Sequence, residues 1–180
     1  MRRLVLIAGS AAVLTGCGTA AQTAKNPEPT ATPVHVRQAD VGDAIALTGV
    51  DETGLTGTLR LAVKVKKVIP TAVGRGAFEN PRKGERFVAV RFVLKNIGST
   101  AYQDSPTFGA KVIDATGHGY DPTVATVTAG RGFPRVVTLL HDQVRSGFIV
   151  FAVPRHARIV AVRYALNAGY ATELGQWHVR

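Results

Sequence analysis

Hydrophobic and polar residues alternate with a period of two over two long stretches of this 180-residue chain, 59–69 and 86–96. A period of two places every second side chain on the same face, so these stretches predict strands with one buried face. Polar residues on the opposite face are typical of antiparallel sheets that expose that face to water. The predicted buried faces are Leu59, Leu61, Val63, Val65 and Ile69 in the first stretch and Val88, Val90, Phe92 and Leu94 in the second.

Five further segments carry shorter or weaker strand patterns, separated by glycine-containing turn sequences. One of them is apolar on both faces around Gly147, which predicts a central strand. No stretch of ten or more residues shows helical periodicity. Seven or eight short strands predict an all-β sandwich of two antiparallel sheets, with an up-and-down barrel as the alternative. The five further segments are 107–114, 136–140, 143–153, 158–166 and 174–179.

The N-terminus has the pattern of an export signal. Arg2 and Arg3 precede the apolar run 4–14, which has the length of a signal-peptide core and is shorter than the about 20 residues that span a bilayer. The single cysteine, Cys17, follows in Leu14-Thr15-Gly16-Cys17, which resembles the bacterial lipobox Leu-x-Gly-Cys. The resemblance implies cleavage just before Cys17 and a thioether-linked diacylglycerol on it, whereas an ordinary secretory signal is the alternative. The lipobox reading predicts a protein anchored by lipid to the extracytoplasmic face of the cell membrane.

The next segment predicts a tether between the signal peptide, 1–16, and the β domain, 44–180. Residues 17–43 are rich in Pro, Thr and Ala and have no apolar periodicity, which is typical of a flexible, partly extended linker. Because the chain has no second cysteine, a domain outside the cytoplasm has to be stabilised by its hydrophobic core and not by disulfides.

Four stretches of strand and turn carry a family pattern: 83–96, 114–122, 147–154 and 175–179. They resemble a family of uncharacterised bacterial lipoprotein domains whose fold is shared with a small secreted immunogenic protein of mycobacteria. The resemblance covers roughly residues 55–180 and implies a telokin-like, immunoglobulin-like sandwich, with no catalytic residues to carry over. Members often have a Pro-Gly-Glu type of turn where this chain has His141-Asp142-Gln143.

Basic residues outnumber acidic ones by 22 to 12, a net charge of +10. Loss of residues 1–16 removes Arg2 and Arg3 and leaves 20 against 12, or +8. Like charges along a strand usually contact solvent and protect an edge from aggregation. A basic patch for anionic lipid headgroups or wall polymers is the functional alternative, which a lipid anchor would reinforce. The predicted patch has Arg60, Lys64 and Lys66 on one face, followed by Lys67 at the edge.

Two loops share a Gly-Arg-Gly core, centred on Arg75 and Arg131. Glycines can turn backbone amides toward an anion, and arginine recognises phosphate or carboxylate. The two loops therefore predict a paired anion-binding rim, although glycine that permits a turn and solvated arginine would explain the same pattern.

The sequence contains no recognisable catalytic or metal-binding constellation. None of its five histidines form His-x-His or His-x₃-His pairs, and Ser146-Gly147 lacks the preceding glycine of a nucleophile elbow. The densest group, Asp114, His118, Tyr120 and Asp121, fits a hairpin turn better than a weak cation site. We therefore predict neither an enzyme nor a cofactor or metal, and export argues against a nucleic-acid partner.

Three functions remain open from sequence. The leading hypothesis is a membrane-tethered, non-enzymatic interaction module of the cell envelope with an envelope protein as partner. The second is a binding protein for an anionic small molecule or envelope polymer, and the third is an enzyme with dispersed catalytic residues.

The lipobox generates a direct prediction. Cys17→Ser removes the sulfur that carries the lipid, so the protein should leave the membrane fraction or remain unprocessed. Cell fractionation and intact-mass measurement test this. Unchanged fractionation together with unchanged mass would contradict lipidation of Cys17.

Overall fold

The computed structural model describes residues 34–51, 54, 56–76 and 79–180. The chain divides into two units, Met1–Ala31 and Thr32–Arg180, and the described residues all belong to the second. Cys17 and the predicted signal peptide lie outside the described residues. Within them, the chain forms eleven strands and one short 3-10 turn, η1. The bounds are β1 His35–Asp40, β2 Ala44–Val50, β3 Thr56–Ala72, β4 Glu85–Asn96, β5 Tyr102–Asp104, β6 Ala110–Asp114, β7 Gly119–Tyr120, β8 Val137–Leu139, β9 Val144–Pro154, β10 Ile159–Ala165, η1 Asn167–Gly169 and β11 Glu173–His178.

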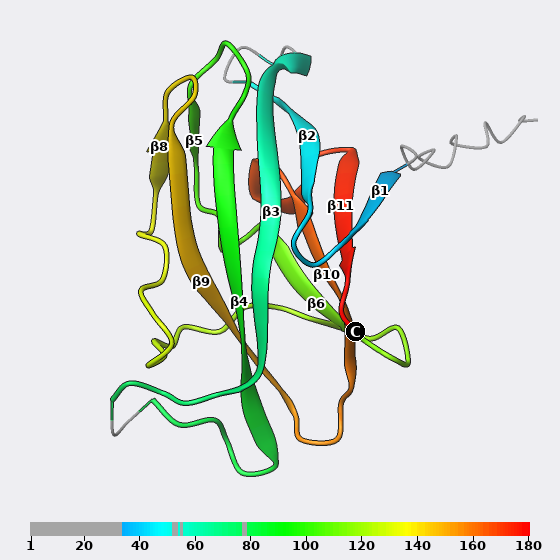
Figure 1. The fold of residues 1–180 in the computed structure, drawn as a ribbon, viewed down its shortest axis with the longest axis vertical. Coiled ribbons are helices and arrows are strands. Elements are labelled where there is room, and N and C mark those ends of the chain that lie inside the picture. Colours follow the sequence, from blue (N-terminus) through cyan, green and yellow to red (C-terminus); the bar gives the residue numbers. More distant parts are fainter. Residues whose placement is uncertain (1–33, 52–53, 55, 77–78) are drawn as a thin grey trace, which may run out of the picture. The chain divides into compact units, whose positions relative to one another are not determined.

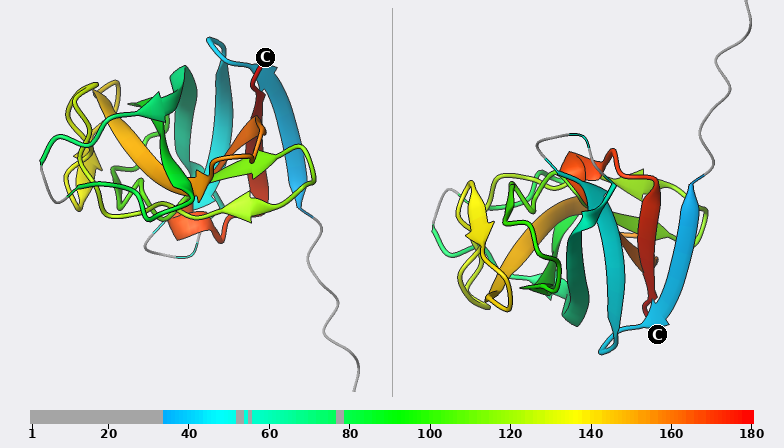
Figure 2. Two further views of the ribbon diagram at one scale, coloured as in Figure 1. Left: turned by 90° about the horizontal axis from the view of Figure 1, so that it is seen from below. Right: turned by 90° about the horizontal axis from the view of Figure 1, so that it is seen from above.

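The strands form a two-sheet sandwich, as predicted, and not a barrel (Figure 1). One sheet has the order β2-β3-β4-β9 and is antiparallel throughout. The other has the order β1-β11-β10-β6-β7, and β5 pairs with β8 in a small third sheet. Figure 2, which views the fold from its two ends, shows the two larger sheets facing each other across the core.

The prediction that the tether extends to residue 43 is wrong. Strand β1 lies inside that range and pairs in parallel with β11, from His35↔Glu173 to Asp40↔His178. The Arg37–Glu173 ion pair at 2.9 Å joins the same strands, and Arg180, two residues past β11, pairs with Asp40 at 2.7 Å. Most of the side chains of β1 are exposed, so main-chain bonds hold this strand and its sequence has no apolar alternation. The folded domain therefore includes β1, and the sheet that contains it is not purely antiparallel.

Aromatic side chains fill the space between the sheets. Trp177 is fully buried, and its indole N–H donates to the Asp43 carbonyl at 2.9 Å. The rings of Phe92 and Tyr164 lie 5.4 Å apart, and the Tyr164 hydroxyl lies 3.3 Å from that of Tyr102. Burial raises the pKa of both tyrosines, so both stay neutral. Phe108, in contrast, is 70% exposed.

A β-bulge in β3 changes which residues face the core. The register with β4 runs from Val65↔Phe92 to Lys67↔Arg91, so Lys66 is an extra residue without a partner. The alternation Leu59, Leu61, Val63, Val65 is confirmed as buried. Beyond the bulge the buried positions shift by one residue, because a bulge inserts one extra residue into one strand only. Val68 therefore packs on the main core, and Ile69, predicted to do so, packs on a second cluster.

That second cluster lies on the outer face of the four-stranded sheet. It comprises Ala72, Phe87, Ala89, Val127, Phe148 and Val150. Strand β9 is apolar on both faces because segment 122–133 covers its outer face, and it is an edge strand of the sheet instead of the predicted central one. A loop thus provides the burial that was expected from a neighbouring strand.

In the turn into β9, a residue other than glycine has the backbone conformation that glycine usually adopts. Asp142 has φ 62°, in the left-handed region, and its N–H donates to the Asn96 carbonyl at 2.9 Å. Its carboxylate pairs with Lys95 at 2.8 Å, and this ion pair lowers the pKa of Asp142. Asn96 is itself buried, and its side-chain amide donates to the carbonyls of Thr100 and Leu139. The turn geometry is therefore set by main-chain bonds around Asn96 and tolerates a non-glycine residue.

Replacing Asp142 separates its backbone strain from its ion pair. Asp142→Gly and Asp142→Ala both lose the carboxylate, but only glycine adopts positive φ without a steric cost. We expect the Gly variant to be more stable than the Ala variant by about 1 kcal/mol in urea melts. Equal stability of the two variants would show that φ at residue 142 is not strained.

Candidate functional site

The predicted basic patch lies on the outer face of the four-stranded sheet, with altered membership. Arg60 and Lys64 are on this face as predicted, opposite the buried alternation of β3. Lys67 lies directly across from Arg91, while the bulge takes Lys66 out of the series. We define the cationic face as Arg60, Lys64, Lys67, Arg91 and Lys95. Within the part of the chain that the structure describes, only Lys95 of this set forms an ion pair, with Asp142.

Lys66 and Lys67 also line a hollow of about 350 Å³ beside the chain's C-terminal residues. Asp40 and Arg180 contribute to the same hollow and are bound to each other at 2.7 Å. This hollow therefore extends the cationic face around the edge of β3.

The two Gly-Arg-Gly loops come together, but one of them already holds an anion from the chain. Val127 forms β-bridges to both Gly74 and Gly130, which places the loops side by side. The Glu79 carboxylate accepts hydrogen bonds from the Gly76 amide at 2.9 Å and from the Thr126 amide and hydroxyl at 2.9 and 2.6 Å. These bonds, with the Thr126 hydroxyl foremost, lower the pKa of Glu79.

The guanidinium groups of the two loops do not converge on a common ligand. Arg75 donates to the Val127 carbonyl at 3.3 Å, so its guanidinium holds the loop together. Arg131 is exposed, and its backbone carbonyl accepts the Phe148 amide at 3.0 Å. The sequence alone did not single out Glu79, which takes the amides that the prediction reserved for an external anion.

The Asp114 group is a turn. The Asp114 carboxylate accepts bonds from the Thr116 amide and hydroxyl, the His118 amide and the Tyr120 hydroxyl, at 2.6 to 3.0 Å. The hydroxyls of Thr116 and Tyr120 lower the pKa of Asp114 to about 2. Asp121 pairs with Lys111 instead of joining this group. Across the described ranges, no three His, Cys, Asp or Glu side chains lie close enough together to hold a metal ion.

The outer edge of β9 presents main-chain groups away from β4. The Phe148 amide and the Val150 carbonyl point outward, because they bond to the Arg131 carbonyl and the Thr123 amide at 3.0 and 2.8 Å. Main-chain groups alternate in direction along a strand, so those of Ser146 and Val144 point outward as well. In the described structure these outward groups have no partner. Half of this edge is therefore covered and half is free.

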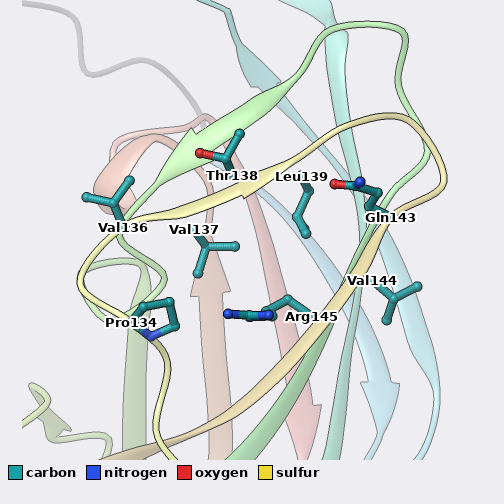
Figure 3. A pocket seen from close by; sticks show the side chains of 8 residues that line it. All are labelled: Pro134, Val136, Val137, Thr138, Leu139, Gln143, Val144 and Arg145. Atoms are coloured by element: carbon teal, nitrogen blue, oxygen red, sulfur yellow. The ribbon is translucent and has the colours of Figure 1, made fainter.

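A hollow of about 390 Å³ lies beside the free half, between β8 and β9. The two strands leave the turn at 140–143 and diverge, as Figure 1 shows. Figure 3 shows the Arg145 side chain lying across the gap toward Pro134 and Val137. Val136 and Val144 are both exposed at the rim. The exposed wall of the hollow is thus mainly polar, with the Arg145 side chain extending through it and valines at its rim.

A second hollow, of about 610 Å³, lies beside the covered half of the same edge. Its wall is mostly apolar and includes Phe133 and Phe148. Phe108 is 70% exposed at its rim and Val124 is fully exposed. We define the β9 border as the free edge Val144–Ser146 together with these two hollows.

Sequence reasoning missed the β9 border. The sequence offered one signal, the valines of segment 136–144, which lie in predicted strands. In the structure Val136 and Val144 are exposed. The border arises because segment 131–133 follows β9 for a short distance and then leaves it, which no local pattern predicts.

The described part of the chain contains no helix of the length and hydrophobicity that a membrane crossing requires.

Comparison with known proteins places the fold. Residues 54–173 match the family model described as Domain of unknown function (DUF4352). The secreted protein MPT63 of Mycobacterium tuberculosis is similar in structure, with a TM-score of 0.55 and 18% identity over 83% of this chain and 100% of its own. YcdA of Bacillus subtilis, proposed to be a lipoprotein, has a TM-score of 0.51 and 14% identity over 66% of this chain and 36% of its own. A search of curated proteins found no match to the sequence.

Proposed function

The chain belongs to the DUF4352 family, and on that premise we propose that it is a non-enzymatic interaction module of the cell envelope. In this proposal Cys17 carries the lipid that holds the protein on the extracytoplasmic face of the membrane. The β domain then binds another envelope polypeptide at the β9 border. The lipobox and the likeness to a secreted protein support the location, and the surface of the domain supports the mode of action.

The observation that carries the proposal is the exposed apolar surface at the β9 border. Phe108 and Val124 flank a hollow whose wall is largely apolar. Soluble proteins rarely expose contiguous apolar surface unless it is a binding site. The polar side chains near it are engaged in bonds that hold the loops, as Glu79 is with Thr126. Binding is therefore the chemistry this surface supports.

Site-specific cross-linking tests the proposal. A photoreactive amino acid at Val124 of the full, membrane-anchored protein should yield a discrete cross-linked product with another envelope polypeptide. The same amino acid at Val36, which is exposed on β1 in the other sheet, is the matched control and should yield little of that product. A product of equal yield from both positions, or none from either, would contradict a binding site at the β9 border.

The cationic face favours a second candidate function, contact with an anionic surface or polymer. Lys67 and Arg91 lie directly opposite each other, an arrangement that repels unless an anion or solvent intervenes. The lipid anchor would hold this face near anionic headgroups, where each surface cation contributes about 1 kcal/mol of attraction. The Gly-Arg-Gly loops do not support this candidate, because Glu79 occupies the amides of the first.

Charge reversal tests this candidate with a matched control. We use the mature chain carrying Cys17→Ser, so that the lipid does not dominate binding, and vesicles that contain anionic lipid. Lys64→Glu with Lys67→Glu should lower binding about tenfold or more, and added salt should lower binding of the unaltered protein. Arg82→Glu with Lys83→Glu makes the same change of charge in the turn before β4 and should have a smaller effect. Equal losses from both pairs, or equal binding to neutral vesicles, would show that the cationic face only contacts solvent.

A further inference from the structure

We infer that the free edge of β9, Val144–Ser146, binds an extended acidic polypeptide segment that adds to the sheet as a strand. The inference rests on the proposed function and names the chemical class of its partner. Strand addition is a general mode of peptide recognition in which main-chain bonds supply affinity and side-chain contacts supply specificity.

The chain itself shows that this edge accepts a strand. Segment 131–133 lies along β9 as a parallel bridge, Gly132↔Phe148, and the Phe148 amide donates to the Arg131 carbonyl at 3.0 Å. Because this bridge is parallel, the residues before Arg131 would lie beside Ser146, but the chain turns away there and Gly130 bridges to Val127. The outward groups of Ser146 and Val144 therefore continue the same row without a partner in the described structure. An incoming segment would therefore occupy the line that the chain's own segment vacates.

The fold leaves room for such a segment. The hollow between β8 and β9 has a volume of about 390 Å³, within the range of ligand pockets. Its floor is formed by Pro134, Val137 and the start of β9, so alternate apolar side chains of an added strand would have contacts (Figure 3). The exposed Val136 and Val144 at the rim would be covered by the same segment.

Charge decides the composition of the partner. Three arginines of the β9 border are exposed: Arg145 on the free edge, Arg131 beside Phe148 on the covered half, and Arg135 in the wall of the second hollow. None of the three forms an ion pair with a described carboxylate, and the nearby Asp142 is engaged by Lys95. Arginine suits carboxylates because its planar guanidinium can donate two parallel bonds. Glutamate or aspartate at alternate positions of the partner would complement these cations.

The same cations argue against a second copy as the occupant. Two free edges of β9 would bring two sets of arginines together, and like charges across an interface oppose association. Charged residues on a short edge are also a recognised device against uncontrolled pairing of sheets. The edge is thus selective for a strand of opposite charge.

The decisive experiment changes one main-chain donor. Ser146→Pro removes the outward N–H, whereas Ser146→Ala keeps it and matches the loss of the hydroxyl. Because the main-chain groups of Ser146 face outward, proline removes no main-chain bond to β4, and proline is tolerated on edge strands. Both variants lose the hydroxyl that accepts a bond from Arg91 at 3.5 Å. Melting curves of the variants establish that both fold.

The probe is a capped seven-residue peptide of alternating valine and glutamate, added to the purified full-length protein in detergent. We expect the Ser146→Pro variant to bind it about tenfold or more weakly than the Ser146→Ala variant. Binding should also slow hydrogen exchange of the Ser146 amide in the unaltered protein. A peptide with lysine in place of glutamate should bind at least about tenfold more weakly.

A second pair of variants keeps the inference testable if proline disturbs the fold. Arg135→Glu with Arg145→Glu should abolish binding of the glutamate peptide, whereas Arg82→Glu with Lys83→Glu should leave it within about twofold. Equal binding of both peptides, or no protection of the Ser146 amide, would overturn the inference. Concentration-dependent dimerisation that Ser146→Pro abolishes would overturn it as well, in favour of a second copy.

The outcomes separate this inference from the proposed function. A cross-link from Val124 together with failure of the glutamate peptide would leave the interaction module standing and reject strand addition by an acidic segment. No cross-link from Val124 would reject the proposed function itself.

Discussion

Unpaired main-chain groups at strand edges are the constraint on which this sandwich depends. A sheet that ends in open water leaves a row of N–H and C=O groups able to pair with another chain. Here the edge of β11 is covered by β1, through the parallel register His35↔Glu173 to Asp40↔His178. The far part of β9 is covered by segment 122–133, which also buries the second apolar cluster. Val144–Ser146 is left free on β9, and Arg145, Val136 and Val144 are exposed there.

Covering an edge with a loop has a consequence for the surface. A loop that follows a strand for two or three residues and then departs leaves a hollow where it departs. Both hollows of the β9 border arise in this way, one on each side of segment 131–133. The exposed Phe108 and Val124 lie at one of them and Arg145 extends through the other. The loop segment that covers most of the β9 edge therefore also shapes the candidate binding surface.

Polar groups that look functional in the sequence are largely used to hold loops. Glu79 satisfies the amides of Gly76 and Thr126, and Asp114 satisfies those of Thr116 and His118. Carboxylates bonded to several amides and hydroxyls have lowered pKa values because those bonds favour the charged form. The lowered pKa values of Glu79 and Asp114 thus mark carboxylates that hold turns.

The sequence alone determined the class of fold and the predicted export signal. Alternation with a period of two is local, and burial between sheets enforced it in β4, where Val88, Val90, Phe92 and Leu94 all face the core. Strand β1 was missed because its exposed side chains carry no such pattern, and Ile69 was misplaced because a bulge at Lys66 shifts the period by one residue. The occupation of the Gly-Arg-Gly amides by Glu79 and the free edge of β9 were decided only in the tertiary structure. The first depends on a contact between Glu79 and Thr126, which are 47 residues apart in the sequence. The second depends on where a loop leaves a strand. Local sequence patterns encode neither of these.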